Sequence, residues 1–234
     1  HNTLPKYNTN PEDREKLHAI RDAVREHKAD VGLGFDGDGD RCGVVDNTGE
    51  EIFADKVGVM LARDMSAVIK DAQFVVDVKS TGLFATDPVL QQQGAKTTYW
   101  KTGHSYMKRR TNELGALAGF EKSGHFFFNA PLGRGYDDGL ISAIAICEML
   151  DRAPAKSMAD LKNALPKTWS SPTMSPHCAD EAKYGIVDTG VEHFEAMQKK
   201  DEEVAGQKDR GRDPRNGGRV PGGGGAWGRG RGAA

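Results

Sequence analysis

The chain has 234 residues, of which 37% are hydrophobic and 28% are charged, and its formal net charge at pH 7 is -2. This length allows one large domain or two smaller ones, each with its own core. The sequence contains neither an apolar run long enough to span a bilayer nor a signal-peptide pattern. Its three cysteines are widely spaced and fit neither a disulfide framework nor a zinc site, so a reduced, cytoplasmic protein is expected.

Strands and helices alternate along the predicted structure. Apolar residues at helical spacing predict a first helix that ends near residue 28. The elements expected after it are strands 31–35, 43–46 and 51–53, a helix that Asp55 caps and that runs to 69, a strand 73–78, a helix 80–93, a strand 95–100, a helix ending near 114, strands 116–120 and 124–129, and a helix 137–150. This alternation predicts an α/β fold, with two consecutive α/β domains that contain mixed sheets.

The carboxyl-terminal part is expected to lose structure. Helices are predicted over 157–165 and 180–199, and the second carries Tyr184, Val187, Val191, Phe194 and Met197 along one face. From about residue 204 the chain is rich in glycine and arginine and has few large apolar residues, so a disordered tail is expected. An Arg/Gly tail can bind nucleic acid, but the body shows neither a basic patch nor stacking aromatics, so no nucleic-acid partner is expected.

An acidic loop joins the first two predicted strands. Asp36, Asp38 and Asp40 are separated by single glycines and are followed by Arg41. Three like charges this close repel one another, and their oxygen atoms suit a hard divalent cation such as Mg2+. A solvated acidic turn is the alternative. A calcium loop of the EF-hand type is excluded, because Arg41 and Asn47 stand where it needs Gly and Glu.

Two lysine- and histidine-bearing segments lie where predicted strands end, which is where α/β sheets place ligands. Lys79 follows the strand 73–78 and is either a phosphate contact or a solvated surface lysine. The segment Lys101-Thr102-Gly103-His104 precedes a helix and suits an anion site. For His104 alone, a capping or surface role is the alternative.

A third polar segment has an alternating pattern. Glu121, Ser123 and His125 are two residues apart, so an extended backbone would direct all three side chains to one side. A carboxylate, a hydroxyl and an imidazole together can hydrogen-bond the vicinal hydroxyls of a sugar, although a polar patch at a strand edge would look the same. Asp137-Asp138-Gly139 is most simply a helix cap.

These motifs occur together in one group of enzymes. Segments 36–41, 101–105 and 121–125, followed by Tyr136-Asp137-Asp138-Gly139, have the order and similar spacing found in that group. From about residue 2 to 150, and more weakly to about 210, the chain resembles the phosphomannomutase/phosphoglucomutase branch of the α-D-phosphohexomutases. The resemblance implies reversible transfer of a phosphoryl group between the 1- and 6-positions of a hexose phosphate, through a phosphoserine and a hexose 1,6-bisphosphate.

The resemblance also implies the roles of individual residues. The implied Mg2+ ligands are Asp36, Asp38 and Asp40. Arg41 and His125 are implied to be catalytic, with Arg41 near the reacting phosphate. Glu121 and Ser123 resemble the pair that binds the sugar 3- and 4-hydroxyls. The implied contacts to the phosphosugar are Lys79, His104 and, on a fainter similarity, Arg231.

The chain departs from the family pattern in several places. The serine-bearing Ser-His-Asn-Pro segment of the family is absent, so the chain is expected to be a fragment that is inactive alone. Its expected parts are a metal-binding domain (1–71), a sugar-recognition domain (72–178) and a remnant of a phosphate-binding domain (179–234). Phe120 also stands where the family usually has Gly.

Two other functions remain open from the sequence. A phosphoglucosamine mutase commonly has Ala where this chain has Gly39, which favours the mannose/glucose branch. A non-catalytic binding module, whose Arg/Gly tail contacts nucleic acid, is the alternative from another class.

Overall fold

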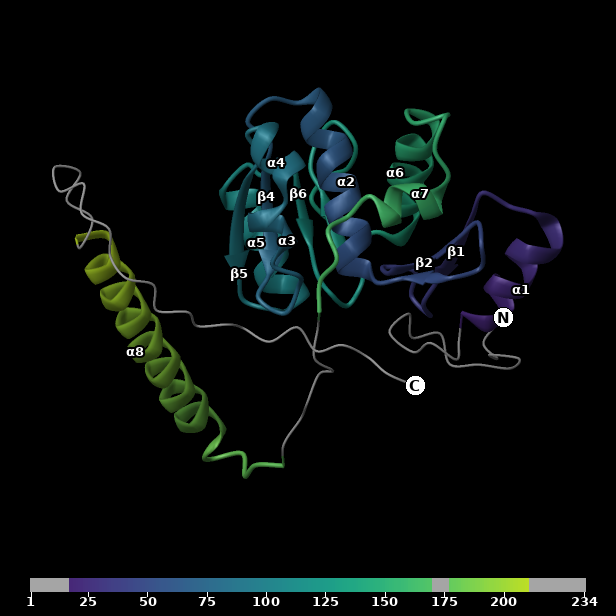
Figure 1. Cartoon of the computed structure of the whole chain (residues 1–234). Coiled ribbons are helices and arrows are strands. Elements are labelled where there is room, and N and C mark those ends of the chain that lie inside the picture. The colour runs from purple at the N-terminus through teal and green to yellow at the C-terminus, as the bar shows by residue number, and fades with distance from the viewer. Residues whose placement is uncertain (1–16, 170–176, 211–234) are drawn as a thin grey trace, which may run out of the picture. The chain divides into compact units, whose positions relative to one another are not determined.

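The computed structural model describes residues 17–169 and 177–210 (Figure 1). The chain divides into two compact units, His1–Ser171 and Pro172–Ala234, which are treated separately below. None of the helices within the described ranges is both long and apolar enough to cross a membrane.

The first sheet of unit 1 is small and antiparallel. It contains β1 (Val31–Phe35), β2 (Cys42–Asp46) and β3 (Glu51–Ile52) in the order β1-β2-β3. Helix α1 (His18–His27) packs against it very closely, because β1 carries glycine where the helix approaches. A Cβ atom on Gly32 would lie only 2.5 Å from a side-chain carbon of Ile20 and 2.6 Å from one of Val24. The acidic loop connects the two strands of the β1–β2 hairpin.

The second sheet is mixed. Its strands are β4 (Gln73–Asp77), β5 (Lys96–Trp100), β6 (Ala118–Phe120) and β7 (Phe126–Phe128), in the order β5-β4-β6-β7. Strand β4 runs parallel to β5 and β6, whereas β7 is antiparallel to β6. Because β4, β5 and β6 are parallel, their carboxyl ends lie along one edge, and the segments that follow them are therefore brought together.

Helices cover both faces of this sheet. Alternate residues of β4 point to opposite faces, so that Val75 packs with Met107 of α5 (His104–Glu113), while Phe74 and Val76 join the larger core. That core also contains residues of α2 (Ala54–Val68), α3 (Leu83–Thr86), α4 (Pro88–Gln92), α6 (Gly139–Asp151) and α7 (Met158–Asn163). Figure 1 shows α2 between the second sheet and the α6–α7 pair.

Phe120 is the centre of the larger core. Its side chain is fully buried, and its ring lies 5.2 Å from that of Phe126, 5.6 Å from Phe84, 5.9 Å from Phe74 and 6.1 Å from Phe128. The residue that departs from the family pattern therefore points into the hydrophobic core.

The α/β fold class and its mixed sheet are confirmed, but two local predictions were wrong. The helix expected over 80–93 is two short helices, since Asp87 is extended before Pro88 and caps α4 through the amides of Val89 and Leu90. Asp55 does not cap α2, which has Phe53 at its N-cap. Asp55 instead accepts a 3.0 Å hydrogen bond from the backbone amide of Thr81.

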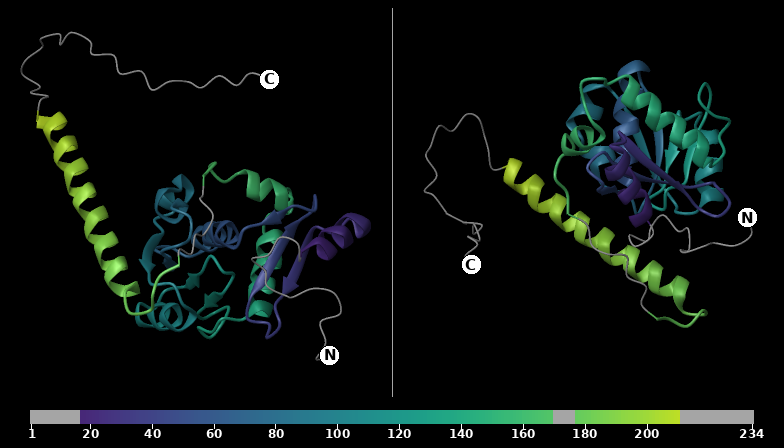
Figure 2. Two further views of the ribbon diagram at one scale, coloured as in Figure 1. Left: turned by 90° about the horizontal axis from the view of Figure 1, so that it is seen from below. Right: turned by 90° about the vertical axis from the view of Figure 1, so that its right-hand side faces the viewer.

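Unit 2 contains one long helix, α8 (Lys183–Arg210), which Figure 2 shows as a single rod in both views. Its predicted apolar face is exposed, with Tyr184 and Phe194 among the large side chains on it. The helix continues past residue 204, where loss of structure was expected, because the segment 204–210 still contains good helix formers. The rest of the glycine-rich tail, including Arg231, lies outside the described residues.

Candidate active site

The acidic loop gathers three carboxylates where β1 is connected to β2. One oxygen atom from each of Asp36, Asp38 and Asp40 lies within 4.8 Å of the others. The chain turns there through Gly39, whose φ of 79° falls in the left-handed region that favours glycine. The donor set consists of oxygen atoms alone, which is the set that Mg2+ prefers.

Arg41 fixes the first of these carboxylates. Its Nε atom lies 2.6 Å from Oδ2 of Asp36, while Oδ1 accepts hydrogen bonds from the amides of Gly39 and Arg41 at 3.1 and 3.2 Å. Burial raises the pKa of Asp36, but the hydrogen bonds and charge of Arg41 outweigh burial and lower it. Asp36 is therefore held ionised and in one orientation.

The carboxylate of Asp40 has fewer hydrogen-bond partners than that of Asp36. Burial, together with the negative charges of Asp36 and Asp38, raises the pKa of Asp40 against the opposing effect of His125. Its Oδ1 atom is buried and has no hydrogen-bond partner. Its nearest cationic group is Nε of Arg41, at 3.9 Å. A buried carboxylate oxygen without a hydrogen bond is costly, and a divalent cation bound by the loop would coordinate it. The loop thus fits a hard metal ion.

The segment 121–125 forms a tight turn between β6 and β7, so the extended backbone that would direct the three alternating side chains to one side is not present. The amide of Gly124 donates to the carbonyl of Glu121, and the amide of Glu121 donates to the carbonyl of His125, both at 3.0 Å. The three alternating side chains nevertheless meet. The hydroxyl of Ser123 lies 2.9 Å from Nδ1 of His125 and donates to Oε2 of Glu121 at 3.2 Å.

Glu121 is only 2% exposed, and its carboxylate also binds the loop that precedes α5. Its Oε1 atom accepts a 2.7 Å hydrogen bond from the amide of Gly103, and its Oε2 atom lies 3.2 Å from Nδ1 of His125. Burial raises the pKa of Glu121, but the interaction with His125 and the Gly103 amide lower it overall. Burial likewise lowers the pKa of His125, and the interactions with Glu121 and Asp40 raise it overall. Each group therefore stabilises the charged form of the other.

His125 joins this turn to the acidic loop. Its Nε2 atom lies 3.5 Å from Oδ2 of Asp40, and its backbone pairs with that of Arg41 in an isolated antiparallel bridge. The two motifs that are most specific in the sequence are therefore in contact, although more than 80 residues separate them.

His104 lies beside this group. Its ring is 6.1 Å from that of His125, and its Nδ1 atom is 3.3 Å from Oδ2 of Asp137. Asp137 was predicted only as part of a helix cap, but Asp138 alone caps α6, through the amides of Leu140 and Ile141. No residue pattern distinguished Asp137 from its neighbour, so its contact with His104 could be seen only in three dimensions.

Lys79 is the described candidate that is least connected to the others. It is exposed in the turn after β4, and within the described ranges no hydrogen bond or ion pair joins it to the other candidate residues. The buried Asp77 organises that edge instead. It accepts from the hydroxyl of Thr102 at 3.1 Å, from the amide of Lys122 at 3.2 Å and from the hydroxyl of Ser80.

Comparison with known proteins assigns the chain to a family. The model for phosphoglucomutase/phosphomannomutase alpha/beta/alpha domain II matches residues 1–49, and that for domain III matches residues 53–169. The chain belongs to the phosphoglucomutase/phosphomannomutase family. The resemblance that the sequence motifs indicated is thereby confirmed, and the relatives carry the names of mutases.

Members of the family resemble the chain over part of their length. The phosphomannomutase/phosphoglucomutase of Pseudomonas putida is 36% identical over 185 residues, which is 79% of this chain and 39% of that protein. The phosphoglucosamine mutase of Syntrophomonas wolfei is 34% identical over 148 residues, or 63% of this chain and 32% of that protein. A crystal structure of a family member from Burkholderia thailandensis has a TM-score of 0.64 at 34% identity, covering 72% of this chain and 36% of that one. The chain therefore spans about two fifths of the curated relatives' length.

Proposed function

We propose that this chain is the metal-binding and sugar-recognition part of a phosphohexomutase, which interconverts hexose 1-phosphates and 6-phosphates through a phosphoserine and a 1,6-bisphosphate. The observation that carries the proposal is the contact between the acidic loop and the 121–125 turn, where Asp40 lies 3.5 Å from His125. If the loop binds a cation and the turn binds hydroxyls, this contact would bring the two together, as transfer of a phosphoryl group to and from a sugar requires.

The acidic loop has the chemistry of a magnesium site. Asp36, Asp38 and Asp40 would hold the ion, and Mg2+ would neutralise charge on the transferring phosphoryl group. Arg41, already oriented by Asp36, would add a fixed positive charge near the same phosphate. His125 would exchange a proton with the sugar hydroxyl at its Nε2 atom, which faces the loop.

The sugar hydroxyls would be bound by Glu121 and Ser123. Both oxygen atoms of Glu121 already accept a hydrogen bond, from Gly103 and from Ser123. An ionised carboxylate has about four acceptor positions, so it can accept a hydroxyl as well. Lys79, His104 and Arg231 are proposed contacts for the phosphate groups of the substrate.

Magnesium binding is the direct test of the acidic loop. Calorimetry on the full chain should detect a Mg2+ site, and Asp38→Asn should weaken it at least about tenfold because an anionic ligand is lost. Asp30→Asn removes the same charge from an exposed residue at the opposite end of β1 from the loop and should leave the affinity unchanged. Equal Mg2+ affinity in wild type and Asp38→Asn would rule out the assigned ligands.

Activity tests the second half of the proposal. The purified chain should bind a hexose phosphate weakly but should not convert mannose 1-phosphate to the 6-phosphate, since no Ser-His-Asn-Pro segment supplies the nucleophile. Substantial turnover by the chain alone would contradict this expectation.

A phosphoglucosamine mutase is the second candidate, and the 34% identity to the Syntrophomonas wolfei enzyme favours keeping it. Calorimetric titration with mannose 1-phosphate, glucose 1-phosphate and glucosamine 1-phosphate would separate the two. Preference for the amino sugar would select the second candidate.

A further inference from the structure

Asp137 lies where three functional segments meet. Its side chain is 8% exposed, and its backbone pairs with Phe127 of β7 in an isolated antiparallel bridge. One of its carboxylate oxygens lies within 4.8 Å of the ligand atoms of Asp40 and His125. The carboxylate is thus largely buried beside the site, although the sequence assigned it no role beyond the cap of the helix that follows.

The two oxygen atoms of this carboxylate serve two different side chains. Oδ2 lies 3.3 Å from Nδ1 of His104, and Oδ1 lies 3.3 Å from Nζ of Lys108. His104 and Lys108 are four residues apart on α5, so they lie on the same face of the helix. The negative charge is also near the first turn of α5, where the helix dipole favours it.

This arrangement determines which ring nitrogen of His104 carries the hydrogen and how the ring is oriented. A neutral imidazole carries one N–H, and a carboxylate oxygen beside Nδ1 stabilises the tautomer with the hydrogen on that atom. The other nitrogen, Nε2, is then left for Ser105, whose hydroxyl is 3.3 Å away, or for a ligand. We propose that Asp137 is a positioning residue that holds the His104 ring so that Nε2 meets the bound phosphosugar, a role that rests on the function proposed above.

The substitution Asp137→Asn tests this role because an amide has only one acceptor oxygen. Lys108 can only donate, so it is expected to take that oxygen and leave the amide NH2 group to face Nδ1 of His104. The His104 hydrogen should then move to Nε2. Asp138→Asn is the matched control, since it removes the same charge one residue away, and Asn is an equally good N-cap for α6.

The first measurement needs no ligand. Nitrogen-15 NMR of the full chain reports the tautomer of each ring once its signals no longer change as the pH is raised, which shows that the ring is neutral. The His104 signals are assigned by their loss in His104→Gln. Wild type and Asp138→Asn should carry the His104 hydrogen on Nδ1, and Asp137→Asn should carry it on Nε2. A wild-type His104 with its hydrogen on Nε2 would overturn the proposal, even if Asp137→Asn failed to fold.

The second measurement is calorimetry with glucose 1,6-bisphosphate in the presence of Mg2+. Asp137→Asn should weaken binding about tenfold, the scale on which the outer partners of a binding histidine act. Because Asp137 acts through His104, the variant that carries both Asp137→Asn and His104→Gln should bind the bisphosphate no more weakly than His104→Gln alone. Additive losses would overturn the proposal. Failure of the wild type to bind the bisphosphate would instead count against the proposed function, while the tautomer would still decide the orientation of His104.

Discussion

The backbone amide of Gly139 donates a 2.9 Å hydrogen bond to the carbonyl oxygen of Gly39, which fastens the first turn of α6 to the acidic loop. The approach is closer than any side chain would allow. A Cβ atom at position 139 would lie 2.6 Å from the Gly39 oxygen and 2.8 Å from the Arg41 oxygen. Both are backbone atoms that cannot rotate away, so the position of the loop depends on the glycine.

Gly139→Ala is therefore expected to displace the acidic loop and to weaken Mg2+ binding by about tenfold, as loss of an outer support of a metal site does. Calorimetry with Mg2+ measures the effect, and circular dichroism checks that the variant is folded. Gly82→Ala is the matched control, because nothing lies within 4 Å of a Cβ placed there. A folded Gly139→Ala variant with wild-type affinity would show that the loop does not need this contact.

Truncation of Phe120 should destabilise the whole of unit 1. Its buried ring contacts four other phenylalanine rings, so Phe120→Ala leaves a large cavity and should lower the free energy of unfolding by about 3–5 kcal/mol. Urea unfolding measures this loss. Val68→Ala on α2, where the side chain is exposed, should cost well under 1 kcal/mol. Similar costs for both variants would mean that the cluster does not form as described.

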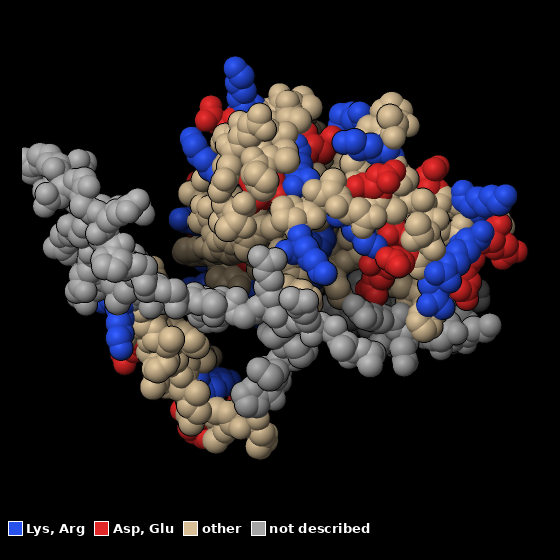
Figure 3. All heavy atoms as spheres, in the orientation of Figure 1, with Lys and Arg blue, Asp and Glu red and all other residues tan. Residues whose placement is uncertain are grey.

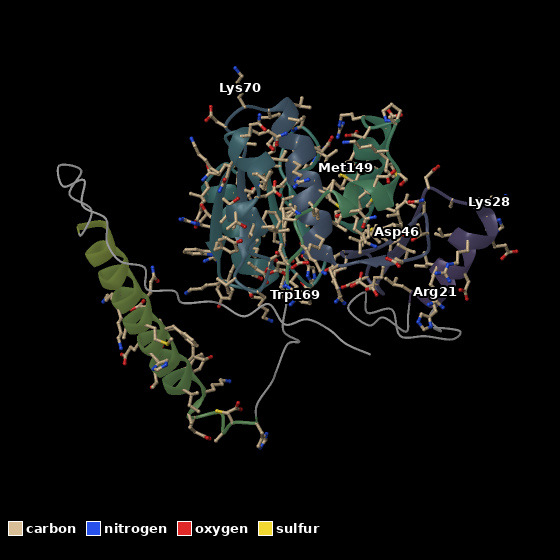
Figure 4. The ribbon with its side chains drawn as sticks, in the orientation of Figure 1. Arg21, Lys28, Asp46, Lys70, Met149 and Trp169 are labelled. Atoms are coloured by element: carbon tan, nitrogen blue, oxygen red, sulfur yellow. The ribbon has the colours of Figure 1, made fainter. Side chains whose placement is uncertain are left out.

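An ion pair joins the turn after β2 to α7. The Nζ atom of Lys162 lies 2.9 Å from Oδ2 of Asp46, whose side chain is fully buried, and 2.8 Å from Oε2 of Glu50; Figure 4 labels Asp46 at this position. Lys162→Ala leaves the buried carboxylate without its charged partner and should cost about 2 kcal/mol at pH 7, measured by urea unfolding. Lys156→Ala, an exposed lysine before α7, is the control and should have little effect.

The same pair predicts how stability depends on pH. Burial raises the pKa of Asp46, but hydrogen bonds from Lys162, Thr48 and the Glu50 amide outweigh it and lower the pKa. A lowered folded-state pKa means that this stabilisation is complete above the unfolded value of about 3.9 and is lost as the pH falls through the folded value. The difference in unfolding free energy between wild type and Lys162→Ala should therefore shrink below about pH 4. A difference that stayed constant down to pH 2 would exclude Asp46 as the titrating group.

Much of the fold follows from local sequence. The β1–β2 hairpin could be predicted because apolar residues flank a loop of Asp and Gly, and the alternation of strands and helices predicted the second sheet. The break in the 80–93 helix was also readable, since Asp87 precedes a proline. The prediction for Asp55 failed because its hydrogen-bond partner, the Thr81 amide, is 26 residues away and belongs to another loop.

The candidate site was predictable as a set of motifs and not as a geometry. Nothing in the sequence indicated that the Glu121 carboxylate would accept a hydrogen bond from the Gly103 amide, because that contact depends on the conformations of the two loops at the edge of the second sheet. The contact between Asp40 and His125 depends on how the two sheets pack, which the sequence did not indicate either. The distribution of surface charge does not help to locate the site, because Lys and Arg are interspersed with Asp and Glu over unit 1 on the face drawn in Figure 3. The assigned roles of the site residues stay predictions.

The contacts between the turn after β2 and α7 have a consequence for the order in which the protein folds. Asn47 accepts a hydrogen bond from the Ala159 amide, and Lys162 pairs with Asp46, across separations of 112 and 116 residues. The β1–β2 hairpin can form soon after it leaves the ribosome, because its contacts are local, but the turn after β2 gains these partners only when α7 emerges. Completion of the smaller sheet is therefore expected to be among the last events of folding, after the larger sheet has been synthesised.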